Sequence, residues 1–348
     1  MQKPQDRFLY VIFLVSAGIL AAMIGSALWN SQNGPKLTLN NRDTNAQNEA
    51  IVSSGSSEPI QNTPTGVFNY GGSTTWIPIH AGVSAMITND FPDFELRYTL
   101  PANGLPSSST GLKMLLGGEL SFAESSRPLK LEEYDEAKQR GFDLEQVTIA
   151  IDGIAVAVNP GIKLPGLSVQ QLQAIYAGQV NNWSELGGPD IPIKAYSKDP
   201  ETSGTAEYFL KSLLDADAYG SNVEFVQETT STLKKVIRDP GGIFYASAPE
   251  VVDQCSIYAM PIAPLSQPNN FIPAYQSSWR TGDDCLAESN TVNKAVFRDG
   301  SYPLTRQLFV VVKVDSDRDE AAGRAYSDIL LSPDGQELVQ QAGFVSVR

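Results

Sequence analysis

The chain has few of the side chains that most often bind metals, since its 348 residues include two cysteines and one histidine. Zinc sites built from Cys and His, and iron–sulfur clusters, need more of these ligands, so neither a metal nor another cofactor is expected. Basic residues are also scarce: 25 Lys and Arg stand against 39 Asp and Glu, a formal net charge of −14. This balance argues against a nucleic-acid partner, which requires a surplus of positive charge. A small anion remains open as a ligand, because a pocket can be locally positive on an acidic protein.

The N-terminus contains an apolar segment, 8–29, that carries no charged residue. As a helix it is roughly 33 Å long, about the thickness of a bilayer core. Lys3 and Arg7 precede it, so the positive-inside rule leaves the N-terminus in the cytoplasm and exports the rest of the chain. Small residues at 25–27 leave cleavage of a signal peptide open. The length of the segment favours a retained signal anchor, with the protein periplasmic and held at the membrane.

Polar residues dominate 30–65, which predicts a flexible linker and leaves 66–348 as the folded part. Cys255 and Cys285 both lie in this exported part. A disulfide between them closes a loop of about 30 residues and contributes roughly 3 kcal/mol in the chain-entropy model. Two separate buried thiols are the alternative.

Strand-like and helix-like patterns alternate through the exported part. Alternation of this kind predicts an α/β fold with mostly parallel sheets. Strands are expected at 66–70, 95–100, 147–158 and 308–314, and helices at 77–88, 111–116, 168–176, 205–214 and 321–331. A Pro-Asp-Gly turn at 333–335 and a shorter helix are expected after the last of these.

Three clusters of Ser, Thr and Gly each stand directly before a helical pattern: Gly72-Ser73-Thr74-Thr75, Ser107-Ser108-Ser109-Thr110-Gly111 and Ser203-Gly204-Thr205. A helix start presents free N–H groups, hydroxyls add donors, and glycine allows close approach. Three such starts facing one point predict a site for a tetrahedral oxyanion. Each cluster taken alone is simply a helix cap. The lone histidine, His80, lies within a helical pattern, where packing is a more common role than catalysis.

The clusters also belong to a longer ordered series. The series comprises Gly72-Ser73-Thr74-Thr75-Trp76, Ser125-Ser126-Arg127-Pro128-Leu129, Asp152-Gly153-Ile154-Ala155, Ile175-Tyr176-Ala177-Gly178, Asn182-Trp183-Ser184-Glu185-Leu186-Gly187, Ser203-Gly204-Thr205, Gly241-Gly242-Ile243-Phe244-Tyr245, Tyr302-Pro303-Leu304-Thr305-Arg306 and Gly343-Phe344-Val345. In this order the motifs resemble the phosphate-binding proteins of phosphate-specific ABC importers, within the periplasmic substrate-binding superfamily. The resemblance covers about 66–348.

The resemblance implies a two-lobed, type II-like binding-protein fold that closes on phosphate. Lobe one is expected at about 66–155 plus 306–348, and lobe two at about 156–305. The segments 147–158 and 308–314 are expected to cross between them. The implied phosphate ligands are Thr74, Thr75, Trp76, Ser108, Ser109, Ser203, Gly204 and Thr205.

Two positions depart from the family pattern. An arginine usually precedes Ser-Gly-Thr, and here Lys198 takes that place, with a point charge rather than a bidentate fork. An aspartate that accepts the phosphate proton usually stands before the Ser-Arg-Pro region, and Ser121 is assigned to its place. This second change predicts weaker discrimination between phosphate and sulfate.

The resemblance implies a non-enzymatic protein that delivers phosphate, or a related oxyanion, to the permease subunits of an ABC importer. A membrane-anchored sensor or scavenger is one alternative. A serine-dependent phosphate-ester hydrolase is another, although no base stands in motif context beside any of the serines.

Overall fold

The computed structural model describes residues 63–216, 218–314 and 317–348. The expected N-terminal helix and nearly all of the expected linker lie outside these residues. In the part of the chain that is described, no helix is both long enough and apolar enough to cross a bilayer.

A long mixed sheet runs through the whole molecule. Its strands follow in the order β2-β1-β3-β11-β4-β8-β6-β7, β9 and β12 also pair with β4, and β5 pairs with β10 in a separate two-stranded sheet. The strands are β1 (Gly66–Gly72), β2 (Phe94–Tyr98), β3 (Phe122–Ser125), β4 (Asp143–Val158), β5 (Leu167–Ser168), β6 (Lys194–Lys198), β7 (Val223–Val226), β8 (Gly242–Ser247), β9 (Tyr258–Met260), β10 (Ile262–Ala263), β11 (Thr305–Val314) and β12 (Val345–Ser346).

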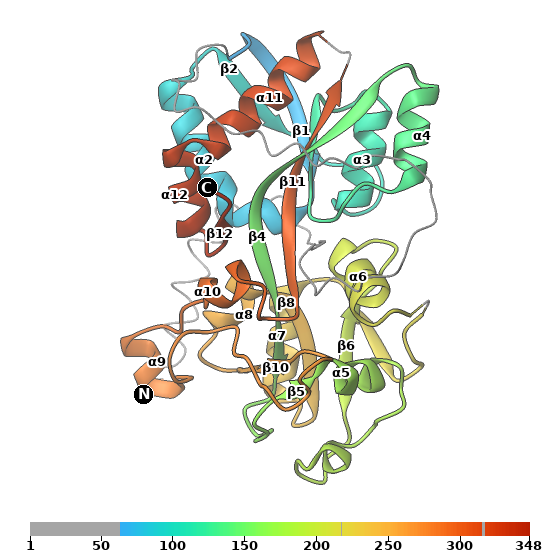
Figure 1. Ribbon diagram of the computed structural model, residues 1–348, viewed down its shortest axis with the longest axis vertical. Coiled ribbons are helices and arrows are strands. Elements are labelled where there is room, and N and C mark those ends of the chain that lie inside the picture. The colour runs from blue at the N-terminus through green and yellow to red at the C-terminus, as the bar shows by residue number, and fades with distance from the viewer. Residues whose placement is uncertain (1–62, 217, 315–316) are drawn as a thin grey trace, which may run out of the picture.

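Helices pack around both halves of this sheet (Figure 1). The α-helices are α2 (Ile77–Asp90), α3 (Ser108–Leu116), α4 (Leu131–Gln139), α5 (Val169–Tyr176), α6 (Gly204–Tyr208), α7 (Thr229–Arg238), α8 (Ala248–Val252), α9 (Gly282–Ala287), α10 (Lys294–Arg298), α11 (Asp317–Leu331) and α12 (Pro333–Gln341). Two 3₁₀ turns, η2 (Thr74–Trp76) and η3 (Trp183–Leu186), and a π-helical turn, η4 (Phe209–Leu213), complete the set.

Two long strands join the halves of the molecule. β4 has 16 residues and pairs antiparallel with β11 along the whole length of β11. At about 3.3 Å per residue, β4 is long enough to run through two packed units. Figure 1 shows both strands passing from the upper half of the molecule, which contains β1 and β2, into the lower half, which contains β6 and β8.

The apolar core divides along these strands. One buried cluster contains Ile154 to Val158 of β4 and the side chains packed around β6 and β8, while others contain Ile149, Ala150 and Leu308 to Val312 with the side chains around β1 and β3. We call the half around β1 to β3, with α2 to α4, α11 and α12, the first lobe. The half around β5 to β10, with α5 to α10, is the second lobe. The structure confirms a two-lobed α/β fold.

The expected helices are present, with two differences in detail. The segment expected as one amphipathic helix, 205–214, begins as α6 and continues as the π-helical turn η4. The Pro-Asp-Gly segment at 333–335, expected as a turn before the last helix, is instead the first turn of α12. Proline is favoured there because the first helical N–H groups have no intrahelical partner, and the Ser332 side chain accepts from the Gly335 N–H.

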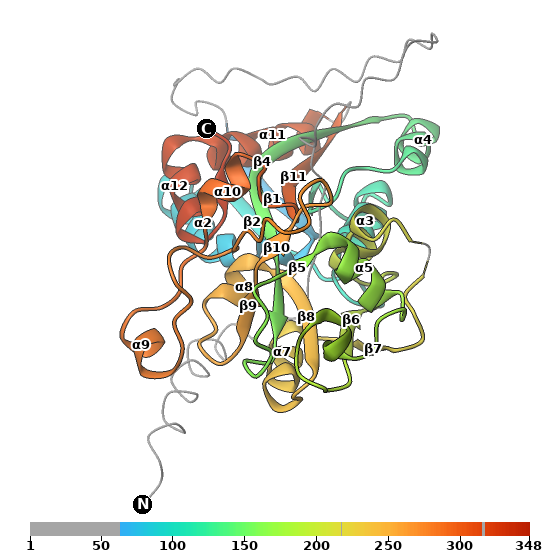
Figure 2. The ribbon, with the colours of Figure 1, turned by 60° about the horizontal axis from the view of Figure 1, so that its bottom comes forward.

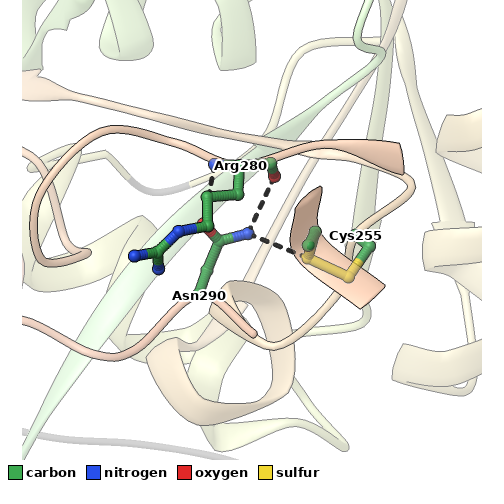
Figure 3. The surroundings of a disulfide bond; sticks show 4 residues. Cys255, Arg280 and Asn290 are labelled. Atoms are coloured by element: carbon green, nitrogen blue, oxygen red, sulfur yellow. Dashed lines mark hydrogen bonds between the residues drawn. A yellow bond between two sulfur atoms is a disulfide. The ribbon is translucent and has the colours of Figure 1, made fainter. Parts of the chain in front are cut away.

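The expected disulfide between Cys255 and Cys285 is present. Figure 3 shows the Asn290 side chain beside it: Nδ2 donates to Cys285 Sγ at 3.3 Å and to the Arg280 carbonyl at 3.0 Å. The bond therefore fixes the segment that carries α9, which lies at the margin of the second lobe in Figure 2.

Candidate functional site at the junction of the lobes

The first cluster lies where β1 ends and η2 begins. Ser73 caps η2, and its Oγ accepts a hydrogen bond from the Thr75 N–H at 3.3 Å. Trp76 is fully buried and its Nε1 donates to the Ser125 carbonyl at 3.2 Å, so its side chain fixes the turn to β3. Thr74 and Thr75 are also buried, and the Thr74 hydroxyl has no hydrogen-bond partner. Buried hydroxyls nearly always have a partner, so Thr74 is a candidate ligand-binding group.

The second cluster joins the first through Ser126. Ser126 Oγ lies 2.5 Å from Ser73 Oγ and 3.5 Å from Ser108 Oγ, and its N–H donates to Ser108 Oγ at 3.2 Å. Two glycines allow this approach, because a side chain at either position would clash. A Cβ added to Gly72 would lie 2.2 Å from the Glu124 carbonyl oxygen, and one added to Gly111 would lie 2.4 Å from the Gly72 Cα. The starts of η2 and α3 are therefore held against each other, with three hydroxyls between them.

Ser121, which was assigned to the aspartate position of the family, lies outside this cluster. β1 and β3 are parallel, with Gly72 opposite Glu124, so Ser73 and Ser126 follow the carboxyl ends of neighbouring strands. Ser121 precedes β3 at its amino end, and its N–H donates to the Asn69 carbonyl in the middle of β1. About four residues of strand, roughly 13 Å, separate the two ends. The assignment to Ser121 is therefore corrected: Ser126 occupies the position beside the helix starts.

The third cluster lies in the second lobe, after the carboxyl end of β6. Ser203 caps α6, with its Oγ accepting from the Ala206 N–H at 3.4 Å, and Thr205 is buried. Lys198 ends β6 and is 5% exposed; its Nζ donates to Thr229 Oγ1, at the start of α7, at 2.8 Å. Burial lowers the pKa of Lys198 to about 8, and the nearby positive charge of Arg306 adds to this effect.

A carboxylate of α8 partly offsets the charge of Lys198. The Glu250 side chain accepts a hydrogen bond from Thr229, the residue that also accepts from Lys198. Burial raises the pKa of Glu250, while the charge of Lys198 opposes the rise. The second lobe thus brings one buried ammonium group to the junction, with a carboxyl group close by.

Arg306 and Asp152 form a buried ion pair between the two crossing strands. They stand directly opposite each other in the pairing of β11 and β4, and neither is more than 1% exposed. Arg306 Nε donates to Asp152 Oδ2 at 2.5 Å, and Ser247 Oγ donates to Asp152 Oδ1 at 2.7 Å. Arg306 Nη2 donates to Thr75 Oγ1 of the first lobe at 3.3 Å. Arg306 therefore touches η2 while its charge acts on Lys198 of the second lobe.

A second group of charges connects the lobes beside Ser109. Arg127 is paired with Glu133 in its own lobe, through Nη1 at 2.9 Å and Nη2 at 2.5 Å, and its Nε lies 3.4 Å from Glu207 Oε2 of α6. Lys130 forms an ion pair with the same Glu207. Ser109 Oγ accepts from Arg127 Nη2 at 3.2 Å and donates to Glu207 Oε2 at 3.5 Å. Ser109, one of the expected phosphate ligands, thus lies at a contact between the lobes.

The structure therefore places most of the expected site residues in two groups, one in each lobe. Thr74, Thr75 and Ser108 lie together in the first lobe, while in the second lobe Lys198 ends β6 and Ser203, Gly204 and Thr205 follow it. Sequence reasoning did not assign roles to Ser126, Arg306 or Glu207. Part of the signal was present, because Asp152 stands in the largely apolar run 147–158, where a buried carboxylate needs a partner. Arg306 stands between Thr305 and Gln307, ahead of the apolar run 308–312, and nothing in the sequence pairs it with Asp152. An anion between the lobes is offered hydroxyls, helix starts and two cations.

Comparison with known proteins places the chain in a family. A family model described as a PBP superfamily domain matches residues 57–334. The chain belongs to the PBP superfamily. The expected binding-protein fold is thereby confirmed.

Curated relatives of the chain carry a more specific description. The phosphate-binding protein PstS of Staphylococcus haemolyticus is 25% identical over 284 residues, which cover 79% of this chain and 79% of that protein. The phosphate-binding protein PstS of Bacillus subtilis is 26% identical over 275 residues, covering 74% of this chain and 87% of that protein.

Solved structures also match the fold. A substrate-binding protein with bound phosphate from Clostridium perfringens superposes with a TM-score of 0.63 at 25% identity, covering 81% of this chain and all of that chain. An ABC-type phosphate transport receptor from Vibrio cholerae superposes with a TM-score of 0.60 at 21% identity, covering 80% and 99%. At 21% identity, the similarity to the Vibrio cholerae receptor supports the fold alone.

Proposed function

We propose that the protein binds inorganic phosphate between its lobes and delivers it to the permease subunits of an ABC importer. The observation that carries the proposal is the convergence of η2, α3 and α6 starts with two buried cations, Arg306 and Lys198. Phosphate is tetrahedral and anionic, so it accepts hydrogen bonds from several directions at once, as this arrangement requires. The descriptions of the relatives agree with this ligand.

The proposed binding residues are Thr74, Thr75, Ser108, Ser126, Lys198, Ser203, Gly204 and Thr205, with Trp76 positioning η2 through its side chain. Binding to both lobes favours the closed arrangement, since only that arrangement brings all of these donors together. The proposed moving units are about 66–155 plus 306–348, and about 156–305.

Isothermal titration of the full chain with phosphate tests the proposal. We expect one phosphate to bind per chain, and we expect Thr75→Ala to lower the affinity for phosphate. Thr88→Ala is a matched control, since Thr88 lies in the last turn of α2 and its hydroxyl donates to the Ser84 carbonyl. Absence of a binding signal with phosphate, sulfate and arsenate would refute the proposal.

A phosphate-ester hydrolase is the competing activity. Nucleophilic serine needs a base within hydrogen-bond reach. The His80 ring Nε2 contacts both carboxylate oxygens of Glu124, at 3.0 and 2.8 Å, which does not supply a serine with a base. Turnover of a chromogenic phosphate ester by the full chain would support the hydrolase, and stoichiometric phosphate binding without turnover supports the carrier.

We also propose that the protein works outside the cytoplasmic membrane, attached by segment 8–29. The disulfide suits an oxidising compartment. Mass spectrometry of the mature protein tests the attachment, and an N-terminus at Leu28 would contradict it. Stimulation of an importer's ATPase activity by the phosphate-loaded protein separates delivery from a sensor or scavenger role.

A further inference from the structure

We propose that Arg306, on the crossing strand β11, is a direct ligand of the bound anion and sets its affinity. This inference rests on the proposed function. The sequence had assigned the main positive charge of the site to Lys198, just ahead of Ser-Gly-Thr in the second lobe. The geometry adds a planar guanidinium on β11, one of the two strands that join the lobes.

The hydrogen bonds of Arg306 carry the argument. A guanidinium has five N–H donors and cannot lose its charge at ordinary pH. Nε is used by Asp152 and Nη2 by Thr75, whereas Nη1 is buried and has no hydrogen-bond partner. A fully buried side chain rarely leaves such a donor unsatisfied. The unsatisfied side of Arg306 therefore suits an acceptor, and a phosphate oxygen pair is its best match.

The surroundings of Arg306 indicate where that acceptor sits. Thr75, which contacts Nη2, follows Thr74, and the Thr74 hydroxyl is the other buried polar atom of η2 without a partner. From the second lobe, Lys198 and Tyr208 both lie within range of the charge of Arg306. Burial lowers the pKa of Lys198 and Arg306 adds to that change, whereas burial raises the pKa of Tyr208 and Arg306 opposes that rise. Arg306 is thus the cation that η2, β6 and α6 share.

The carboxylate paired with Arg306 does not compete for this position. Each oxygen of Asp152 already accepts a hydrogen bond, one from Ser247 and the other from Arg306 Nε. The ion pair fixes the guanidinium plane through Nε and leaves Nη1 without a partner. Asp152 is therefore a positioning residue, and Arg306 is the residue that contacts the anion.

The alternative is that Arg306 only stabilises the pairing of β4 with β11. Arg306→Lys separates the two roles, because lysine retains the charge next to Asp152 but cannot reach Asp152, Thr75 and an anion together. Phosphate affinity is measured by titration of the full chain, and thermal unfolding without phosphate is measured in parallel. We expect a 10- to 100-fold loss of affinity in Arg306→Lys.

Arg324→Lys is the matched control, because Arg324 pairs with Glu145 of β4 at 2.9 Å and has no part in the proposed site. Its phosphate affinity should equal that of the wild type. Asp152→Asn weakens the Arg306 ion pair but keeps the guanidinium, so it should lose less affinity than Arg306→Lys even where its thermal stability falls. If Arg306→Lys fails to fold, the double variant Asp152→Asn/Arg306→Gln replaces the ion pair with two neutral amides and should bind phosphate at least 100-fold more weakly.

Phosphate affinity within threefold of the wild type in the folded Arg306 variant would overturn the inference while leaving the proposed function intact. An equal loss of affinity in Asp152→Asn and Arg306→Lys would also overturn it, because the ion pair rather than the guanidinium would then be responsible. If the wild type itself does not bind phosphate, the proposed function fails and the inference fails with it.

Discussion

Raising the pH from 7 to 9 should weaken phosphate binding about tenfold through Lys198 alone. Burial lowers the pKa of Lys198 to about 8, so the free site holds this proton at pH 7 and has mostly lost it at pH 9. An anion about 4 Å from the ammonium favours the charged form by about 4 kcal/mol at an effective dielectric constant of 20. That interaction returns the pKa of Lys198 toward its ordinary range, so binding above pH 8 must first restore the proton.

The sign of the effect on stability is opposite. A lysine whose pKa is lowered by folding destabilises the free protein while both states are charged, below about pH 8. This contribution fades as the pH rises from there to the unfolded value of 10.5, so the free protein gains stability as binding weakens. Burial raises the pKa of the neighbouring Glu250 and the charge of Lys198 opposes this rise, so removing the lysine would raise the pKa of Glu250 further. Replacement by arginine, which keeps the charge, is therefore the cleaner perturbation.

Calorimetry in buffers of different ionisation enthalpy measures the proton directly. At pH 8 we expect uptake of about half a proton by Lys198 for each phosphate bound, in addition to the ionisation of phosphate itself. Lys198→Arg should abolish the Lys198 contribution, since arginine stays charged, while the exposed Lys194 at the other end of β6 provides the control Lys194→Arg. Equal proton uptake by the wild type and Lys198→Arg would refute the reasoning.

Three further predictions concern hydroxyls and a carboxylate at the junction. Thr75→Ala and Thr205→Ala should each weaken phosphate binding by about 1.5–3 kcal/mol, measured by titration, and unaltered affinity in both would place the anion elsewhere. Ser126→Asp should raise the preference for phosphate over sulfate at least tenfold, because a carboxylate accepts the phosphate proton and repels sulfate. Competition of sulfate with labelled phosphate measures this preference, and an unchanged preference would show that Ser126 does not face the anion. Glu207→Gln should speed phosphate release about fivefold in stopped-flow experiments, since it removes about 1 kcal/mol of partly exposed ion pairs between the lobes, and an unchanged release rate would contradict that role.

Local signals explain which features the sequence predicted well. Helix starts depend on neighbouring residues, and Ser168 caps α5 as expected, with Gln171 completing a capping box. The clusters at Ser107 and Ser203 also cap helices, at α3 and α6. The buried strand β4 follows from a largely apolar run, interrupted by Asp152, of the kind found in sheets covered on both faces.

The parts that were missed depend on contacts between distant residues. Ser121 and Ser126 are five positions apart, and choosing between them requires knowing that β3 runs parallel to β1 and which end meets η2. Arg306 and Asp152 are 154 residues apart, and only the antiparallel pairing of β11 with β4 sets them opposite each other. Glu207 gains its role from Arg127 and Lys130 in the other lobe, which no local pattern reveals.

A crystal structure of the full chain with bound phosphate tests the central claim most directly. The account predicts one phosphate between the lobes, with its oxygens within hydrogen-bond distance of Thr75, Thr205, Lys198 and Arg306 Nη1. Phosphate bound at any other place, with the Arg306 guanidinium and the start of η2 making no contact to it, would contradict the account.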